Sequence, residues 1–143
     1  MTDQPTRVSH DITHQAALKM LAAACDAAVA TGRDQCIVVV DTRTAVVASV
    51  RMNGGKVPSM RSATAKAMTA AANNAPTGAM PAEFAANLAA ATDGIVTNLK
   101  GGLPIRFGGV PAGAIGVGSG TPDQDIAVAK AALAAIGADE IEV

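Results

Sequence analysis

Aromatic residues are almost absent from this sequence. Its 143 residues include no tryptophan and no tyrosine, and the two phenylalanines are Phe84 and Phe107. Half of the residues are nevertheless hydrophobic, which argues against a disordered chain. Alanine is the commonest of them, and an alanine-filled core buries little area at about 25 cal/mol per Å². We therefore expect close helix packing or a partner subunit, and we predict a homo-oligomer, a dimer at least.

Several classes of protein are excluded by what else is missing. The net charge is −1 with lysine and arginine scattered, so no basic patch for nucleic acid is present. No apolar run approaches the roughly 20 residues of a membrane helix. The two cysteines, Cys25 and Cys36, form no disulfide framework. The N-terminal sequence lacks the apolar segment of a signal peptide, and we predict a cytoplasmic protein.

A glycine-rich stretch near the C-terminus has the clearest local pattern. Two apolar runs, 103–107 and 110–117, are separated by Gly108-Gly109, which predicts a hairpin because both turn positions need a positive φ. A loop rich in glycine follows, and then a helix is expected over 121–136. Thr121 and Gln124 have the spacing of a capping box at its start.

The remaining elements follow from periodicity. Residues 1–9 are polar and predicted to be flexible, and residues 10–143 are predicted to form one domain. Helices are expected over 11–30 and 59–73 and from 81 to the Asp93-Gly94 stop. Strands are expected over 35–41, 45–51 and, as a short edge strand, 95–99. Hairpin-joined strands with covering helices predict an α+β fold with an antiparallel sheet of about five strands.

The glycine loop before the last helix suggests two roles. Backbone N–H groups at a helix start attract anions, but Asp123 and Asp125 put two carboxylates in or beside the first turn. No complete phosphate-loop motif is present either. The sequence therefore favours a turn-and-cap role.

The two histidines, His10 and His14, are four residues apart. They form at most half a metal site, and no further histidine exists, so no metal site is predicted. His14 borders an apolar helical edge formed by Leu18, Leu21 and Cys25. A neutral imidazole beside an apolar groove suits an axial haem ligand, although on residues alone a surface or half-buried histidine explains it better.

Three cations are candidates for substrate binding. Lys66 lies in an alanine-rich helix, Arg106 lies within a hairpin strand and can hold a carboxylate at two points, and Arg61 precedes Lys66 by five residues. The ordinary interpretation is a lysine with its head in solvent and surface arginines. No motif for nucleophilic acyl transfer is present.

The stretch GGLPIRFGGVPAGAIGVGSGTPDQDIAVAKAAL resembles the C-terminal signature of the GlcG/HbpS-like family, which includes the C-terminal domain of PduO. Upstream, Val39-Val40-Asp41, Arg51-Met52-Asn53-Gly54 and Ala65-Lys66-Ala67 resemble it too, so the match covers about residues 12–137 in order. In the signature itself the matching positions are Gly101, Gly102, Pro104, Gly113–Val117, Thr121, Pro122, Gln124 and Asp125.

The resemblance implies a profilin-like, five-stranded antiparallel sheet flanked by helices, and frequent dimers or higher assemblies. Some members of the family bind haem, and others are encoded in catabolic operons. A histidine in the first helix is implicated in haem binding in parts of the family, and His14 has a comparable place. The resemblance thus implies haem as the cofactor, with His14, Leu18 and Leu21 at the site.

Two functions from different classes remain open. The first is a module that binds haem or another small cofactor in a groove between the first helix and a neighbouring subunit. The second is a small lyase, hydratase or isomerase acting on a carboxylated catabolic intermediate. In that case Arg61, Lys66 and Arg106 would bind or polarise the substrate, and Asp41 would be the base.

Overall fold

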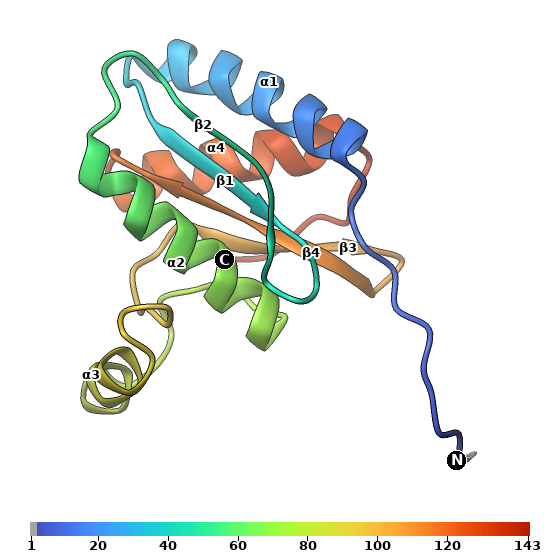
Figure 1. Ribbon diagram of the computed structural model, residues 1–143. Helices are drawn as coiled ribbons and strands as arrows, with labels where there is room; N and C mark the ends of the chain where they lie inside the picture. The colour runs from blue at the N-terminus through green and yellow to red at the C-terminus, as the bar shows by residue number, and fades with distance from the viewer. Residues whose placement is uncertain (1–2) are drawn as a thin grey trace.

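A four-stranded antiparallel sheet in the order β2-β1-β4-β3 forms the centre of the molecule (Figure 1). The computed structural model describes residues 3–143. Along the chain the elements are α1 (His14–Thr31), β1 (Cys36–Val40), β2 (Val46–Arg51), α2 (Val57–Asn73), α3 (Ala82–Ala91), β3 (Gly102–Phe107), β4 (Val110–Gly118) and α4 (Pro122–Ala135). No helix within residues 3–143 is both long and apolar enough to cross a membrane.

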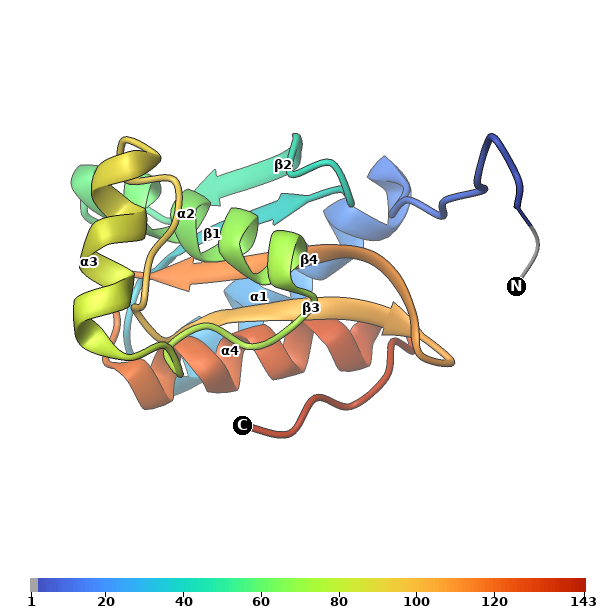
Figure 2. The ribbon, with the colours of Figure 1, turned by 90° about the horizontal axis from the view of Figure 1, so that it is seen from below.

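The sheet separates two apolar layers (Figures 1 and 2). Ile37 and Val39 of β1 face the layer formed with α1 and α4, whereas Val38 and Val40 face α2. All five residues of β1 are buried, as the continuous apolar run predicts for a strand covered on both faces. The α+β class and the antiparallel hairpins are confirmed.

Helix α2 lies directly on the backbone of β3 and β4. A Cβ atom added to Gly116 would be 2.0 Å from the carbonyl oxygen of Ala63, and one added to Gly102 would be 2.4 Å from that of Lys66. Only glycine allows this approach, and alanines supply the facing side of α2. Close packing of small residues thus makes this part of the core dense without aromatic side chains.

Turn and cap residues set the boundaries of the elements. Gly108 and Gly109 have φ angles of 57° and 82°, so the two-residue hairpin turn is confirmed. Thr121 and Gln124 form the complete capping box at the start of α4. Helix α1 starts three residues later than predicted, because Thr13 caps it by accepting a hydrogen bond from Ala16 N.

The prediction of a fifth strand over 95–99 is wrong. Backbone groups of this segment pair with side chains instead of a strand: Thr97 N donates to Thr69 Oγ1, and the Thr69 hydroxyl donates to the carbonyl oxygen of Ile95. The side chain of Asn98 bonds the backbone N and O of Met80. The segment therefore runs beside α2, and β3 remains an edge strand.

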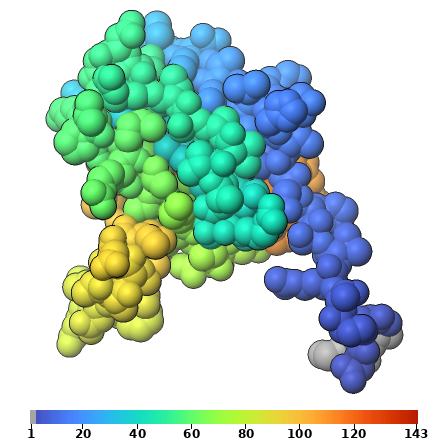
Figure 3. Space-filling model, viewed as in Figure 1, coloured from blue at the N-terminus to red at the C-terminus, as the bar shows by residue number. Residues whose placement is uncertain are grey.

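Helix α3 stands apart from the body of the molecule. Figure 3 shows α3 and the following loop as a projecting lobe, and α3 packs against none of the other helices or strands of residues 3–143. Phe84, one of the two aromatic residues, lies on this helix and is 57 % exposed. Ala85 is the one buried residue of this helix.

Candidate functional site

A cavity of about 310 Å³ lies where the starts of α2 and α4 meet the loops before β1 and β3. We call it the cationic pocket, because four of its lining residues carry positive charges and one carries a negative charge. Its lining residues are Arg33, Lys56, Ser59, Ser62, Lys66, Leu99, Lys100, Ser119, Gly120, Pro122 and Asp125.

A buried ion pair forms part of this pocket's wall. Lys66 Nζ lies 3.0 Å from Asp125 Oδ2 and donates a further hydrogen bond of 2.7 Å to the carbonyl oxygen of Val117. The two residues are only 5 % and 2 % exposed. Asp125 Oδ1 also accepts hydrogen bonds from Gln35 Nε2 at 2.7 Å and from Gly120 N at 3.1 Å.

Opposing effects act on the carboxyl group of Asp125. Burial raises the pKa of Asp125, and the hydrogen bond and the charge of Lys66 act in the other direction. Gln35 is fully buried and its Oε1 atom has no hydrogen-bond partner. Lys66, Asp125 and Gln35 therefore form a polar network that protein encloses almost completely.

The glycines around the pair explain the glycine-rich loop. A Cβ atom at Gly101, whose φ is +122°, would lie 3.0 Å from the Asp125 Cβ and 3.1 Å from Lys66 Nζ. A Cβ atom at Gly120 would lie 2.1 Å from Gln35 Nε2. These glycines let the backbone close over Lys66 and Asp125, and a phosphate-loop role is not needed to explain them.

Sequence reasoning identified Lys66 but not its partner. In the sequence, Asp125 stands out as a carboxylate beside the glycine loop and as a position of the family signature, and Gln35 as the start of a strand. A lysine within the alanine-rich stripe of a helix must find a counter-charge when it is buried. That requirement was the available signal, but it does not say which carboxylate meets the lysine.

The other candidates for substrate binding are not gathered with Lys66. Arg106 donates from Nε to Asn74 Oδ1 at 2.8 Å and from Nη2 to the Asn74 carbonyl oxygen, so it fastens β3 to the end of α2. Asp41 accepts hydrogen bonds from the backbone N atoms of Arg43 and Ala45 in the β1–β2 turn. Arg61 is exposed on α2 and lines a separate hollow of about 300 Å³.

His14 is the first residue of α1, and its side chain is exposed. Leu18, one turn further, is 57 % exposed, whereas Leu21 is 8 % exposed and belongs to the core. His10 precedes the helix and is exposed. Within residues 3–143, no group of three or more His, Cys, Asp or Glu residues has an arrangement that can hold a metal ion.

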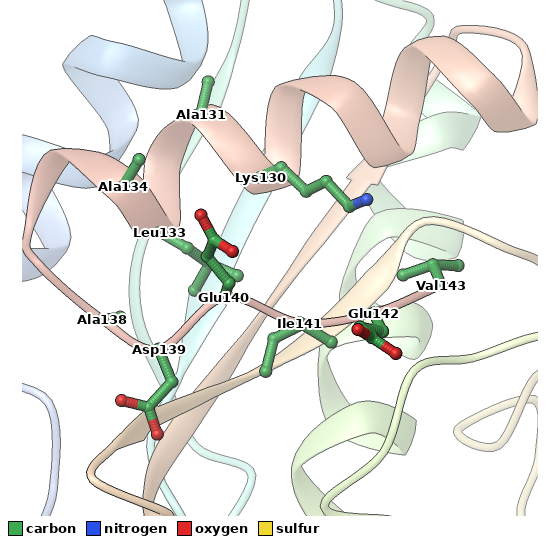
Figure 4. A pocket seen from close by; sticks show the side chains of 10 residues that line it. All are labelled: Lys130, Ala131, Leu133, Ala134, Ala138, Asp139, Glu140, Ile141, Glu142 and Val143. Atoms are coloured by element: carbon green, nitrogen blue, oxygen red, sulfur yellow. The ribbon is translucent and has the colours of Figure 1, made fainter.

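A hollow of about 810 Å³ lies between α4 and the C-terminal segment (Figure 4). Its lining contains Asp139, Glu140 and Glu142 but only one cation, Lys130. Asp139 is already engaged, because it accepts hydrogen bonds from the backbone N atoms of Gly108 and Gly109. The excess of carboxylates repels an anionic ligand, so this hollow is a poor place for a propionate or another carboxylate.

Comparison with known proteins defines the family. The sequence model of the family described as "Haem degrading protein HbpS-like" matches residues 12–134. The chain therefore belongs to the HbpS-like family. A search of curated proteins finds no match for this chain.

Solved structures agree with this assignment. The ORFY protein of Klebsiella pneumoniae has a TM-score of 0.86 and 26 % identity, with 98 % of this chain and 100 % of that chain covered. A double mutant of Streptomyces reticuli HbpS has a TM-score of 0.77 and 34 % identity, with 96 % of this chain and 94 % of that chain covered. A PduOC:heme complex has a TM-score of 0.80 at 22 % identity, with 92 % and 99 % covered, and shows the same fold.

Proposed function

We propose that this protein binds haem. Its family is described as haem degrading, and a protein of the same fold has been solved with haem bound. The observation in this chain that supports the proposal is the exposed pair His14 and Leu18 at the start of α1. An imidazole nitrogen is a common axial ligand of haem iron, and apolar side chains beside it suit a porphyrin.

The apolar surface continues beyond the first turn of α1. Cys25 is half-buried and Val29 is 67 % exposed, and both fall on the same helical stripe as His14 and Leu18. From His14 to Cys25 the helix rises about 16 Å. Leu21 borders the stripe and belongs to the core.

One helix face covers only one side of a flat ligand, so the proposed site includes a second copy of the chain. The copy would lie across the stripe of α1 and exclude water from the other side of the porphyrin. A homo-oligomer, a dimer at least, is therefore part of the proposal. The free thiols Cys25 and Cys36 suit a reducing compartment, and we place the protein in the cytoplasm.

A haemin titration followed by absorbance tests the proposal. We expect stoichiometric uptake with a shifted Soret band, and loss of that shift in His14→Ala. His10→Ala is the matched control because it removes an exposed imidazole outside the helix. If His14→Ala binds haemin as wild type does, His14 is not the ligand.

A second function is favoured by the Lys66–Asp125 pair. A lysine and a carboxylate in the wall of a pocket are suited to proton transfer on a carboxylated compound, as a lyase, hydratase or isomerase requires. Of the candidates Asp41, Arg61, Lys66 and Arg106, only Lys66 lines this pocket.

Solvent deuterium exchange tests for this chemistry. Small hydroxy and keto acids would be incubated with the protein in D₂O, and loss of C–H signals would be followed by proton NMR. We expect exchange with wild type and none with Lys66→Met, provided that circular dichroism shows the variant to be folded. Equal exchange with both proteins would remove Lys66 from the chemistry.

A further inference from the structure

Positive charge is concentrated in the cationic pocket although the chain as a whole has a net charge of −1. Arg33, Lys56, Lys66 and Lys100 line it, and Asp125, the one carboxylate of the lining, is already paired with Lys66. The charges come from segments far apart in the sequence, so the fold itself gathers them. A cavity of this kind stabilises an anion.

Hydrogen-bonding capacity is left over in the same region. An ammonium group has three N–H donors, and Lys66 uses two of them on Val117 and Asp125. The start of α2 has no side-chain cap and no acidic residue in its first turn. The starts of α1 and α4, in contrast, are capped by Thr13 and Thr121.

The cations divide into two pairs along the cavity. A neighbouring hollow of about 380 Å³ shares Arg33, Lys56 and Ser119 with the cationic pocket, and we call these two cations the outer pair. Lys66 and Lys100 line the cationic pocket but not the neighbouring hollow, and we call them the inner pair. Arg33 Nε donates to the Ser119 carbonyl oxygen at 2.9 Å, and Lys56 N donates to Ser119 Oγ at 3.1 Å. The first bond positions the Arg33 side chain, and the second fixes the backbone of Lys56, at the boundary of the two hollows.

We propose that the cationic pocket binds a small dicarboxylate. One carboxylate lies at the inner pair, Lys66 and Lys100, and the other lies at the outer pair, Arg33 and Lys56. A single compact anion such as phosphate would contact one pair of cations and leave the other pair without an anionic partner. It would also bring its full charge close to Asp125.

This site is separate from the proposed haem site. The pocket lies at the C-terminal end of α1, where Arg33 follows the helix, and His14 begins the other end. Eighteen helical residues correspond to a rise of about 27 Å. The dicarboxylate and haem proposals can therefore fail independently, because the two sites share no residue. The dicarboxylate proposal does share Lys66 with the proton-transfer function proposed above, and calorimetry tests binding separately from that chemistry.

Isothermal titration calorimetry with succinate tests the ligand class. We expect succinate to bind at least about tenfold more tightly than acetate, because one charged pair of contacts is lost with acetate. Succinamide, with the same length and no charge, should not bind. Absence of succinate binding overturns the proposal, and so does phosphate binding as tight as that of succinate.

Variants at the pocket test the location. Lys56→Gln and Lys100→Gln are exposed and should fold normally, and each should weaken succinate binding about tenfold. Lys19→Gln is the matched control, since it removes an exposed lysine outside the pocket. Equal weakening by Lys19→Gln would mean that net charge, and not the pocket, governs binding. Haemin uptake should be unchanged by saturating succinate.

Discussion

Lys66 Nζ on α2 and Asp125 Oδ2 on α4 are 3.0 Å apart, although the two residues are 59 positions apart in the chain. The two side chains meet beside Gly101 and Gly120, where an added Cβ atom would lie 3.1 Å from Lys66 Nζ and 2.7 Å from Asp125 Oδ1, respectively. The contact connects helices from opposite faces of the sheet, and both charges are removed from water.

Removing either member of this pair should strongly destabilise the fold. Lys66→Met leaves an unpaired buried carboxylate and Asp125→Leu an unpaired ammonium, and each should lower the free energy of unfolding by about 3–5 kcal/mol. The double variant should recover most of that loss, because no unpaired charge remains. Urea denaturation monitored by circular dichroism measures all three. Losses that simply add in the double variant would contradict this account.

Gly116→Ala should be among the most damaging single-methyl additions in the chain. Its Cβ would lie 2.0 Å from the Ala63 carbonyl oxygen, so α2 would have to move away from β4. We expect a loss of about 3 kcal/mol or more. Gly94→Ala is the control: its φ is +80° but nothing lies within 4 Å of the added atom, so only about 1 kcal/mol is expected. Similar denaturation midpoints for the two variants would refute close packing of α2.

Asp139 should give the fold a defined pH dependence. The backbone N–H groups of Gly109 and Gly108 lower the pKa of Asp139 below 3.8. A carboxyl group with a lowered pKa stabilises the folded state above its unfolded pKa, and the contribution is lost as the pH falls through the folded pKa. Asp139→Asn should therefore lower the denaturation midpoint at pH 7, and the difference from wild type should shrink as the pH falls through the lowered pKa of Asp139. A difference independent of pH would contradict the role of the charge.

Self-association should depend on the exposed stripe of α1. Leu18→Glu puts a charge on that stripe and should dissociate the oligomer at micromolar concentration, as measured by sedimentation velocity. Lys19→Glu, on the neighbouring exposed position, is the control and should leave the assembly unchanged. If the wild-type protein sediments only as a monomer, both the proposed assembly and the proposed two-sided haem site are wrong.

The hairpins and helix caps could be predicted because their signals are local. The turn at Gly108-Gly109 and the helix cap at Thr121 depend only on these residues and a few neighbours in the sequence. The prediction of an edge strand over 95–99 was wrong for the opposite reason, since the side chain of Thr69 forms hydrogen bonds with backbone groups of that segment. A contact with a residue more than 25 positions away has no signature within the segment itself.

The candidate site likewise combines residues that the sequence singles out with residues that only the fold brings together. Lys66 could be selected because a lysine within an alanine-rich stripe is chemically unusual. Arg106 was a candidate for the same kind of reason, but it is occupied by Asn74 at the end of α2. Arg33, Lys56 and Lys100 look like ordinary surface cations in the sequence. Only the meeting of four separate segments makes them one pocket.

The separate position of α3 implies that the protein unfolds in parts. This helix packs on no other helix or strand of the described chain, and Ala85 is its one buried residue. Its opening therefore exposes little apolar surface and leaves the sheet intact. Amide hydrogens of α3 should exchange with solvent through local openings of low free energy, whereas those of β1 should exchange only through global unfolding.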